Sequence, residues 1–432
     1  MTDHTFPPPR KAFWGVLAQR DFRLLWMGDA MAGLAKGVTS VVLPLIALLN
    51  LSAGPFEIGL LASAVWLPWL VIGLPAGAWV DSMSRRPIMI ACHASSAVLF
   101  ASIPLAWWLD VLTYGHLLAV ALLTGTATLF FQTAYNVYLP TVLAKEDLIE
   151  GNAKIQGAEA ATRIAGPALG GGLVTAFGAA TGLLVEVLSC LFCLVCILLI
   201  RSREPARTKR EREEPFTRQI ATGLRFVARD PYLRPIITYG AIVNLGLTGY
   251  TTIQIVFLVQ SVGVDASVVG GLVAVAGLGG ILGSLVARPL GRRFGTARSV
   301  VVCQLATGPF VLLSPLTTPG AGLAFFCVGT CMLIAGVVAC NVVLGSFRQS
   351  YCPPSLLGRV VATSMFVLHS TIPVGALLAG VLGDTVGPLA TMWIMAALIA
   401  PCGLILLLSP MRRQRDLPRE PLTVPHRVHA AE

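Results

Sequence analysis

The sequence predicts an all-α integral membrane protein whose twelve transmembrane helices form two pseudo-symmetric halves of six. Composition is the first reason: 55% of the 432 residues are hydrophobic and only 12% are charged, which excludes an ordinary soluble globular protein. The second is a series of twelve apolar stretches, each with about the 20 residues that a helix needs to cross a bilayer. The expected spans are residues 22–49, 57–80, 88–108, 116–139, 155–177, 181–200, 233–259, 266–288, 297–316, 320–345, 358–383 and 387–409.

The placement of basic residues sets the expected orientation. The chain has 31 Lys and Arg, and all except Lys36 lie in the tails, in one alternate set of loops, or within a few turns of them. Because such residues are retained on the cytoplasmic side, both termini are expected in the cytoplasm of a multi-pass plasma-membrane protein. The net charge of +10 then belongs to the flanks of the spans, and nucleic acid is not an expected partner. The opposite loops contain neither Lys nor Arg: 50–56, 109–116, 177–182, 260–267, 316–320 and 384–388.

A long polar stretch, residues 201–232, divides the two halves. Its first part is densely charged, whereas its second part has a helical pattern of apolar residues that is typical of a helix at a membrane interface. This gives five predicted regions. They are a cytoplasmic tail (1–21), a six-helix half (22–200), the linker (201–232), a second six-helix half (233–409) and a cytoplasmic tail (410–432).

An internal repeat supports the division. Gly77 and Gly283 begin related Gly-rich and Arg-rich turns after the second and eighth spans, 206 positions apart. Pro167 and Pro373 repeat at the same distance, in the fifth and eleventh spans. Parallel six-span repeats are typical of secondary transporters, whose substrate site lies between the halves.

The segment after the second span carries a family resemblance. Gly77, Asp81, Arg85 and Arg86 match the loop motif of the major facilitator superfamily, although Ser82 and Ser84 depart from it. The resemblance implies the major facilitator fold and a cytoplasmic gate, in which Asp81 pairs with Arg85 or Arg86 or caps another helix. The alternative is a simple positive flank, which explains the arginines but leaves Asp81 unexplained.

Within the superfamily the chain most resembles the bacterial drug-efflux branch that includes macrolide exporters. The opening segment 22–26, the segment 74–77 and the segment 150–154 carry this resemblance. In the fifth span, Gly166, Pro167, Gly170 and Gly171 partly match the antiporter motif of exporters, although Thr162 stands where a glycine is expected. Proline kinks a helix and small residues allow close packing, so this span can bend against its neighbour. Ordinary close packing of membrane helices is the alternative.

Three ionisable residues inside the membrane are functional candidates by their position alone. Asp29 and Lys36 lie seven residues apart, on one face of the first span. Asp29 is a candidate proton carrier or a hydrated residue near the cytoplasm. Lys36 either forms a structural ion pair, snorkels, or contacts substrate. Glu186, in the sixth span, is either a second proton site or a packed, protonated acid.

Further polar residues have more ordinary explanations. Glu159 and Arg163 are spaced i, i+4 and are expected to pair. His369 could titrate near neutral pH but is more simply explained by packing. Cys190, Cys193 and Cys196 have metal-like spacing in an apolar run, where we expect packed thiols and no metal site. The resemblance implies further cavity residues in spans one, four, seven and ten: Gln132, Tyr135, Asn136, Asn244, Tyr250, Gln254 and Asn341.

We therefore expect a secondary active transporter that exports small lipophilic or amphipathic compounds by alternating access and proton antiport. The chain has no phosphate-binding loop and no convincing nucleophile with a base, so neither an enzyme nor ATP use is expected. No cofactor is expected beyond the proton gradient as energy source. The expected partners are the small-molecule substrate and the lipid bilayer, with a monomeric protein. An importer of a small nutrient or peptide on the same fold is the first alternative, and a non-transporting membrane sensor or scaffold is the second.

Overall fold

The computed structural model describes residues 15–143, 147–178, 182–201, 224–352 and 354–418, and within them the chain is almost entirely helical. Every expected span corresponds to a helical segment. In the first half these are α1 (Arg20–Leu45), α2 (Pro55–Val71) with α3 (Gly73–Ser82), α4 (Arg85–Trp108), α5 (Tyr114–Val142), α6 (Leu148–Phe177) and α8 (Leu184–Leu199). In the second half they are α10 (Leu233–Val256), α11 (Ala266–Phe294), α12 (Thr296–Thr307), α13 (Leu323–Tyr351), α14 (Pro354–Thr385) and α15 (Pro388–Ile399) with α16 (Gly403–Leu407).

These helices have the length and apolar character of membrane spans. Among the described residues, nine helical segments are long and apolar enough to cross a bilayer, and α2 and α8 are shorter apolar helices. Short π-helical or 3-10 turns extend four of the spans: η2 (Ile46–Asn50), η4 (Phe257–Ser261), η5 (Gly308–Leu316) and η7 (Ala400–Cys402). The predicted fold, a two-half helical membrane protein, is confirmed.

The second span is broken where the sequence predicted one continuous helix. α2 ends at Val71 and α3 begins at Gly73, with Ile72 between them at φ −120° and ψ 3°. Pro75 has no backbone N–H, so it cannot bond to the carbonyl of Val71 four residues earlier. The break at Ile72 lies where this hydrogen bond is missing, and α3 then leads to the Arg85–Arg86 turn.

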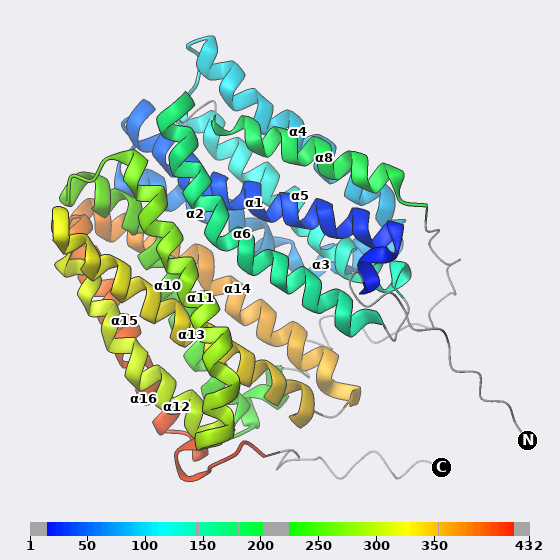
Figure 1. Ribbon diagram of the computed structural model, residues 1–432, viewed down its shortest axis with the longest axis vertical. Helices are drawn as coiled ribbons and strands as arrows, with labels where there is room; N and C mark the ends of the chain where they lie inside the picture. The colour runs from blue at the N-terminus through cyan, green and yellow to red at the C-terminus, as the bar shows by residue number, and fades with distance from the viewer. Residues whose placement is uncertain (1–14, 144–146, 179–181, 202–223, 353, 419–432) are drawn as a thin grey trace, which may run out of the picture.

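The helices pack within two halves, which then meet along two pairs of helices (Figure 1). In the first half, α1 packs against α6 and α8, while α2 packs against α5. In the second half, α11 packs against α13, and α10 packs against α14 and α15. Between the halves, α2 packs against α14 and α6 against α11. The two contacts are equivalent under the internal repeat. The repeat relates the second span (α2) to the eighth (α11) and the fifth span (α6) to the eleventh (α14), so it carries the α2–α14 contact onto the α6–α11 contact.

The two halves are closed together at the end opposite Gly15 and Pro418, the first and last described residues, whose end of the molecule is called the terminal end below. At the closed end, Gly59 of α2 faces Gly380 of α14, and Gly171 of α6 faces Gly270 of α11, so closely that an added Cβ would meet the partner's backbone. Toward the terminal end, the two halves diverge in Figure 1. The described parts of the two halves are therefore in closest contact at the end where these glycines meet.

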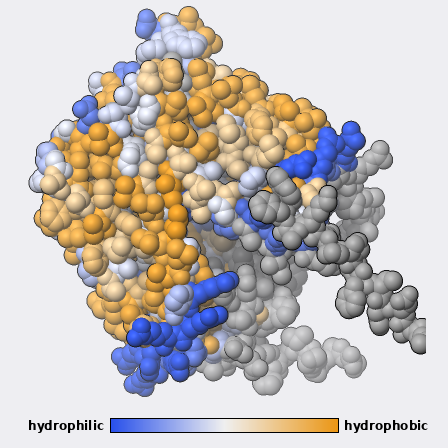
Figure 2. Space-filling model, in the orientation of Figure 1, coloured by the Kyte–Doolittle hydropathy of each residue, from blue (hydrophilic) through white to orange (hydrophobic). Residues whose placement is uncertain are grey.

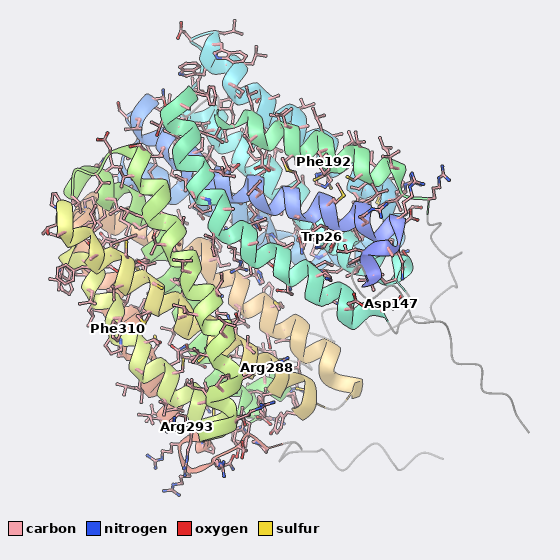
Figure 3. The ribbon with its side chains drawn as sticks, in the orientation of Figure 1. Trp26, Asp147, Phe192, Arg288, Arg293 and Phe310 are labelled. Carbon is pink, nitrogen blue, oxygen red and sulfur yellow. The ribbon has the colours of Figure 1, made fainter. Side chains whose placement is uncertain are left out.

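The flanks of the bundle are apolar, as expected of surfaces that face lipid (Figure 2). Leu188, Leu191 and Val195 on α8 are exposed apolar side chains, and Figure 3 places Phe192 and Phe310 on opposite outer flanks. Hydrophilic residues gather at the terminal end, where Figure 3 shows Arg288 and Arg293 in the second half. This arrangement matches a membrane protein with basic residues at one face.

A buried aspartate organises the start of the second half. Asp230 is fully buried, and one carboxylate oxygen accepts hydrogen bonds from the backbone N–H groups of Tyr232 (2.9 Å) and Leu233 (2.8 Å). The other oxygen accepts from the hydroxyl of Tyr351 at the end of α13 (2.7 Å). The carboxylate thus satisfies the free donors at the start of α10 and ties α10 to α13.

The linker and the tails fall mostly outside the described residues. Residues 224–229, at the end of the predicted interfacial helix, are helical. The described part of the C-terminal tail folds back on α12: the Arg415 carbonyl accepts from Ala297 N–H (3.1 Å), and an Asp416 carboxylate oxygen accepts from Thr296 N–H (3.0 Å). The predicted domain boundaries stay predictions.

Candidate transport site

Asp29 lines a small pocket inside the first half, between α1, α4, α5 and α8. Leu25 and Gly28 flank it on α1, and the pocket is closed by His93 of α4, Tyr135 of α5 and Cys193 of α8. The Tyr135 hydroxyl is buried and has no hydrogen-bond partner among the described residues. Asp29 thus shares a mostly apolar pocket with a tyrosine and a histidine, two side chains that can exchange hydrogen bonds or protons with a carboxyl group. Its role as proton carrier stays a prediction.

His93 was not singled out from the sequence. Its ring contacts Phe131 edge-on, at 4.6 Å between centroids, and Phe131 lies beside Tyr135 at 5.7 Å. The signal was available, because an ionisable residue in a transmembrane helix is a functional candidate by default. Only the neighbouring Asp29, which lies on another helix, distinguishes His93 from a packed histidine, and sequence spacing does not reveal that neighbour.

Lys36 lies near the middle of α1 and is exposed, facing the space between helices. Its ammonium lies 5.8 Å from the centroid of the Trp66 ring on α2, within the range of a cation–π contact. It is within electrostatic range of Asp29 and Glu186. Among the described residues, however, no carboxylate lies within the 4.0 Å of an ion pair with Lys36. The structural ion pair that the sequence allowed is therefore not formed in this state.

Glu186 is partly buried at the start of α8 and is held by a short hydrogen bond. The hydroxyl of Thr39 on α1 donates to its carboxylate at 2.6 Å. The contact joins the first and sixth spans through one polar pair in an otherwise apolar region. A carboxyl group in this position is either a proton carrier or a packed neutral acid, and the geometry is compatible with both.

The glycines of the predicted kink form the two contact faces of α6. A Cβ at Gly166 would lie 2.6 Å from the Cα of Gly37, and one at Gly170 would lie 3.1 Å from the carbonyl of Val38, both on α1. Gly171 faces Gly270 of α11 instead. The segment around Pro167 is thus the place where α6 touches both its own half and the other half. Its role in antiport stays a prediction.

Glu159 and Arg163 pair on α6, as the sequence predicted. A guanidinium nitrogen of Arg163 lies 2.6 Å from a carboxylate oxygen of Glu159. Both side chains are substantially exposed, and exposed i, i+4 pairs contribute only about 0.3–0.5 kcal/mol. The pair neutralises two charges near the inter-half space and adds little stability.

The remaining cavity candidates separate into two groups. Gln132 and Asn136 of α5, with Asn341 of α13, are exposed, as residues of a cavity wall would be. Asn244 of α10 is partly buried and donates to the Leu368 carbonyl at 3.2 Å.

Two further candidates on α10, Tyr250 and Gln254, are buried. Tyr250 is fully buried, and its hydroxyl bonds to Ser314 (2.8 Å) and Thr330 (2.7 Å), while Gln254 is also buried. In this state, therefore, the Tyr250 hydroxyl points into the second half, away from the space between the halves. Their role in substrate binding stays a prediction.

The gate motif is only partly described. Arg86 at the start of α4 donates to the carbonyl of Leu198 near the end of α8, at 2.9 Å. This places a guanidinium where a helix C-terminus carries partial negative charge. Gly77 and Asp81 belong to α3, but the Asp81 side chain lies outside the described residues. The predicted latch between Asp81 and Arg85 or Arg86 stays a prediction.

An aromatic cluster that the sequence did not predict joins the halves in the middle of the bundle. The His369 ring of α14 stacks on Trp69 of α2, with centroids 5.2 Å apart and planes 17° apart. Trp66 lies 5.7 Å from the His369 ring and 6.2 Å from Trp69. His369 also bonds through Nδ1 to the Met365 carbonyl at 2.8 Å. Because that carbonyl can only accept, Nδ1 carries the proton and Nε2 is left as the acceptor in the neutral ring.

The cysteines of α8 pack as expected. Cys190, Cys193 and Cys196 are buried and form no disulfide with one another. Cys193 donates to the Gly28 carbonyl at 3.1 Å, and the Cys196 Cβ would lie 3.7 Å from a Cβ added at Gly28. These thiols therefore form part of the α1–α8 contact.

Comparison with known proteins decides the family. Residues 11–429 match the family described as transmembrane secretion effector. The chain belongs to the major facilitator superfamily. It is a membrane transporter and not an enzyme.

Its curated relatives include drug exporters. The multidrug efflux pump Tap of Mycolicibacterium fortuitum is 26% identical over 411 residues, covering 92% of this chain and 98% of the relative. Macrolide efflux protein A of Streptococcus pyogenes is 20% identical over 372 residues, covering 85% of this chain and 90% of the relative. The resemblance to a drug-efflux branch of the superfamily is thereby confirmed.

A solved structure with the same fold belongs to a protein described as a nucleoside transporter. The crystal structure of the nucleoside transporter NupG matches with a TM-score of 0.71 at 12% identity, covering 91% of this chain and 99% of that one. At this identity the likeness shows the fold alone. Direction of transport therefore has to be argued from the family and from the residues of this chain.

Proposed function

We propose that this transporter exports lipophilic or amphipathic compounds across the plasma membrane by alternating access, driven by proton antiport. The observation that carries the proposal is the family match to transmembrane secretion effectors, in a chain with partly buried carboxyls at Asp29 and Glu186 within its membrane helices. The efflux pumps among its relatives support export.

Two carboxyl groups support proton coupling. Asp29 lines a pocket with His93 and Tyr135, and Glu186 accepts from Thr39. Protonation of either removes a charge from the membrane interior, and such a change favours one conformation over another when the surroundings of the carboxyl differ between them. We propose that protonation favours the return from the outward-open to the inward-open state.

The orientation follows from the loops. We propose that the terminal end, which carries the basic residues, faces the cytoplasm. With this orientation the glycine contacts lie on the outer side, and we propose that the structure represents an inward-facing state. The proposed energy source is the proton gradient, without a further cofactor, and the proposed form is a monomer in the lipid bilayer.

The direct test is accumulation of labelled lipophilic drugs, including macrolides, in cells with and without the protein. An uncoupler is added midway. Lower accumulation that rises on uncoupling supports proton-driven export. Higher accumulation in cells with the protein would instead support the importer, the second candidate. That alternative keeps the fold, because the nucleoside transporter NupG shares it.

A further inference from the structure

The Lys36–Trp66 contact bridges two helices that pack against different neighbours. α1 packs mainly against α6 and α8, whereas α2 packs mainly against α5 and α14. The Lys36 side chain is exposed and extends from α1 until its ammonium lies 5.8 Å from the Trp66 centroid. Lys36 and the aromatic rings thus lie along the same stretch of the space between the helices, near the middle of the bundle.

The Lys36 ammonium has N–H donors that no described carboxylate accepts. Among the described residues, no carboxylate lies within 4.0 Å of the ammonium, which instead makes a cation–π contact with the Trp66 ring. An ammonium has three N–H donors, and an aromatic face satisfies it only by attraction to the ring quadrupole. A charge inside a membrane protein is costly unless it meets water or a partner. Lys36 is therefore ready to donate to an oxygen acceptor on a bound molecule.

The rings beside Lys36 supply a stacking surface that comes from both halves. Trp66 and Trp69 belong to the first half and His369 to the second. All three side chains are partly exposed, so their faces are not wholly covered by protein. Because aromatic faces attract flat rings and a cation lies at one side, this surface is selective for a flat ligand with an acceptor group.

We propose that Lys36, Trp66, Trp69 and His369 form a substrate subsite for a planar aromatic ring that bears an oxygen acceptor, either a carbonyl or a carboxylate. The subsite names a substrate class and so rests on the proposed function. The ring stacks on the tryptophans and His369, while the Lys36 ammonium donates to the acceptor. Because His369 lies on the other half, a ligand held here contacts both halves and senses their separation.

The charges around the subsite are few. Lys36 is the cation on this stretch of α1, with Asp29 and Glu186 at longer range, and the Glu159–Arg163 pair on α6 is internally neutral. An aromatic cation would meet the Lys36 charge directly, so the subsite disfavours it. A neutral carbonyl loses less than a carboxylate when Lys36 is removed, because its bond to the ammonium is charged on one side only.

The test is equilibrium dialysis of three ligands that share one ring, against the full chain in nanodiscs with empty nanodiscs as blank. The ligands are naphthalene-2-carboxylate, naphthalene-2-carboxamide and naphthalen-2-ylmethylammonium, and cyclohexanecarboxylate reports the contribution of the aromatic ring. The wild-type protein is expected to bind the carboxylate and carboxamide at least about tenfold more tightly than the ammonium.

Variants assign the preference to residues. Lys36→Met is expected to weaken carboxylate binding about tenfold and carboxamide binding less, while Lys36→Arg retains both. Trp66→Leu is expected to weaken both aromatic ligands several-fold and leave cyclohexanecarboxylate unchanged. Trp108→Leu, an exposed tryptophan at the end of α4, is the matched control and is expected to change nothing. A monodisperse elution profile shows that each variant is folded.

Unchanged binding of the carboxylate in folded Lys36→Met or Trp66→Leu protein would overturn the subsite, as would equal or tighter binding of the ammonium ligand. These outcomes are separate from a failure of the proposed function. If cells with the wild-type protein show no drug export, the function fails whatever the binding data show. If they show export while the variants retain wild-type ligand selectivity, the subsite alone fails.

Discussion

Gly171 of α6 and Gly270 of α11 meet backbone to backbone between the two halves. A Cβ at Gly270 would lie 2.6 Å from the Cα of Gly171 and 2.5 Å from the carbonyl oxygen of Pro167. The equivalent contact on the other side of the molecule joins Gly59 and Gly380, where an added Cβ would lie 2.7 Å from the partner's Cα. These two contacts close the molecule opposite its terminal end, and neither leaves room for a side chain.

A larger residue at Gly270 should therefore open this end. We expect Gly270→Val to separate the halves there, because the valine would meet backbone atoms that cannot rotate away. Spin labels at Val111 and Val386, in loops of the two halves at this end, would report the change as a longer distance by pulsed electron resonance. The accessible native cysteines would first be replaced.

The neighbouring glycine provides the control. An added Cβ at Gly271 would meet nothing within 4 Å. Gly271→Val adds the same side chain one position along α11, and we expect it to leave the label distance unchanged. If both variants gave the wild-type distance, the glycine contact would not be what holds this end closed.

The Thr39–Glu186 pair leads to a prediction about energy coupling. We expect Glu186→Gln to reduce proton-driven export at least about tenfold, because glutamine accepts from Thr39 but cannot carry a proton. Thr39→Val should have a smaller effect, since it removes the hydrogen bond and keeps the carboxyl. Proton flux in liposomes that contain a pH-sensitive dye would measure both, with Asp110→Asn in the loop after α4 as control. Wild-type proton flux in Glu186→Gln would contradict the prediction and leave Asp29 as the candidate proton carrier.

The sequence predicted the fold because membrane spans have a simple physical signature. About 20 apolar residues are enough to identify each span, and each of the twelve expected stretches corresponds to a helix. The break at Ile72 is the exception. Its cause, Pro75, is present in the sequence, but many proline-containing membrane helices continue: α6 runs through Pro167 without ending. Local sequence alone therefore does not distinguish a break from a kink.

The site was less predictable because it depends on which helices lie together. Glu159 and Arg163 lie on one helix, so their pairing followed from spacing. Trp66 and His369 lie about three hundred residues apart in the sequence, and only the packing of α2 against α14 brings their rings together. Tyr250 shows the opposite problem: its helix was placed correctly, but its side chain points into the second half toward Ser314 and Thr330.

Asp230 leads to a prediction about stability. The buried carboxylate accepts three hydrogen bonds from α10 and Tyr351. We expect Asp230→Ala to lower the free energy of unfolding by about 1–3 kcal/mol, because it leaves buried donors without a partner. Tyr351→Phe removes only one of these bonds and should cost about 1 kcal/mol. Unfolding in detergent would measure both changes.

The matched control for Asp230 is Asp265, which precedes α11 and makes no side-chain hydrogen bond to its helix. Asp265→Ala should have a much smaller effect. Equal losses in the two variants would mean that removing any aspartate at a helix start destabilises the protein, and that the buried network is not special.

Asp81 gives the last prediction, which concerns the gate at the terminal end. Asp81 lies near the end of α3, four residues before Arg85, and Arg86 is already held at the end of α8 by the Leu198 carbonyl. If Asp81 joins this arginine turn to another element, the bond must form in one state and break in the other. We expect Asp81→Asn to abolish drug export while the protein still inserts into the membrane. Cell-surface protein level and drug accumulation, measured in the same cells, separate these effects. Normal export by a membrane-localised Asp81→Asn variant would contradict the gate. Arg85 and Arg86 would then be explained simply as basic residues that flank the membrane.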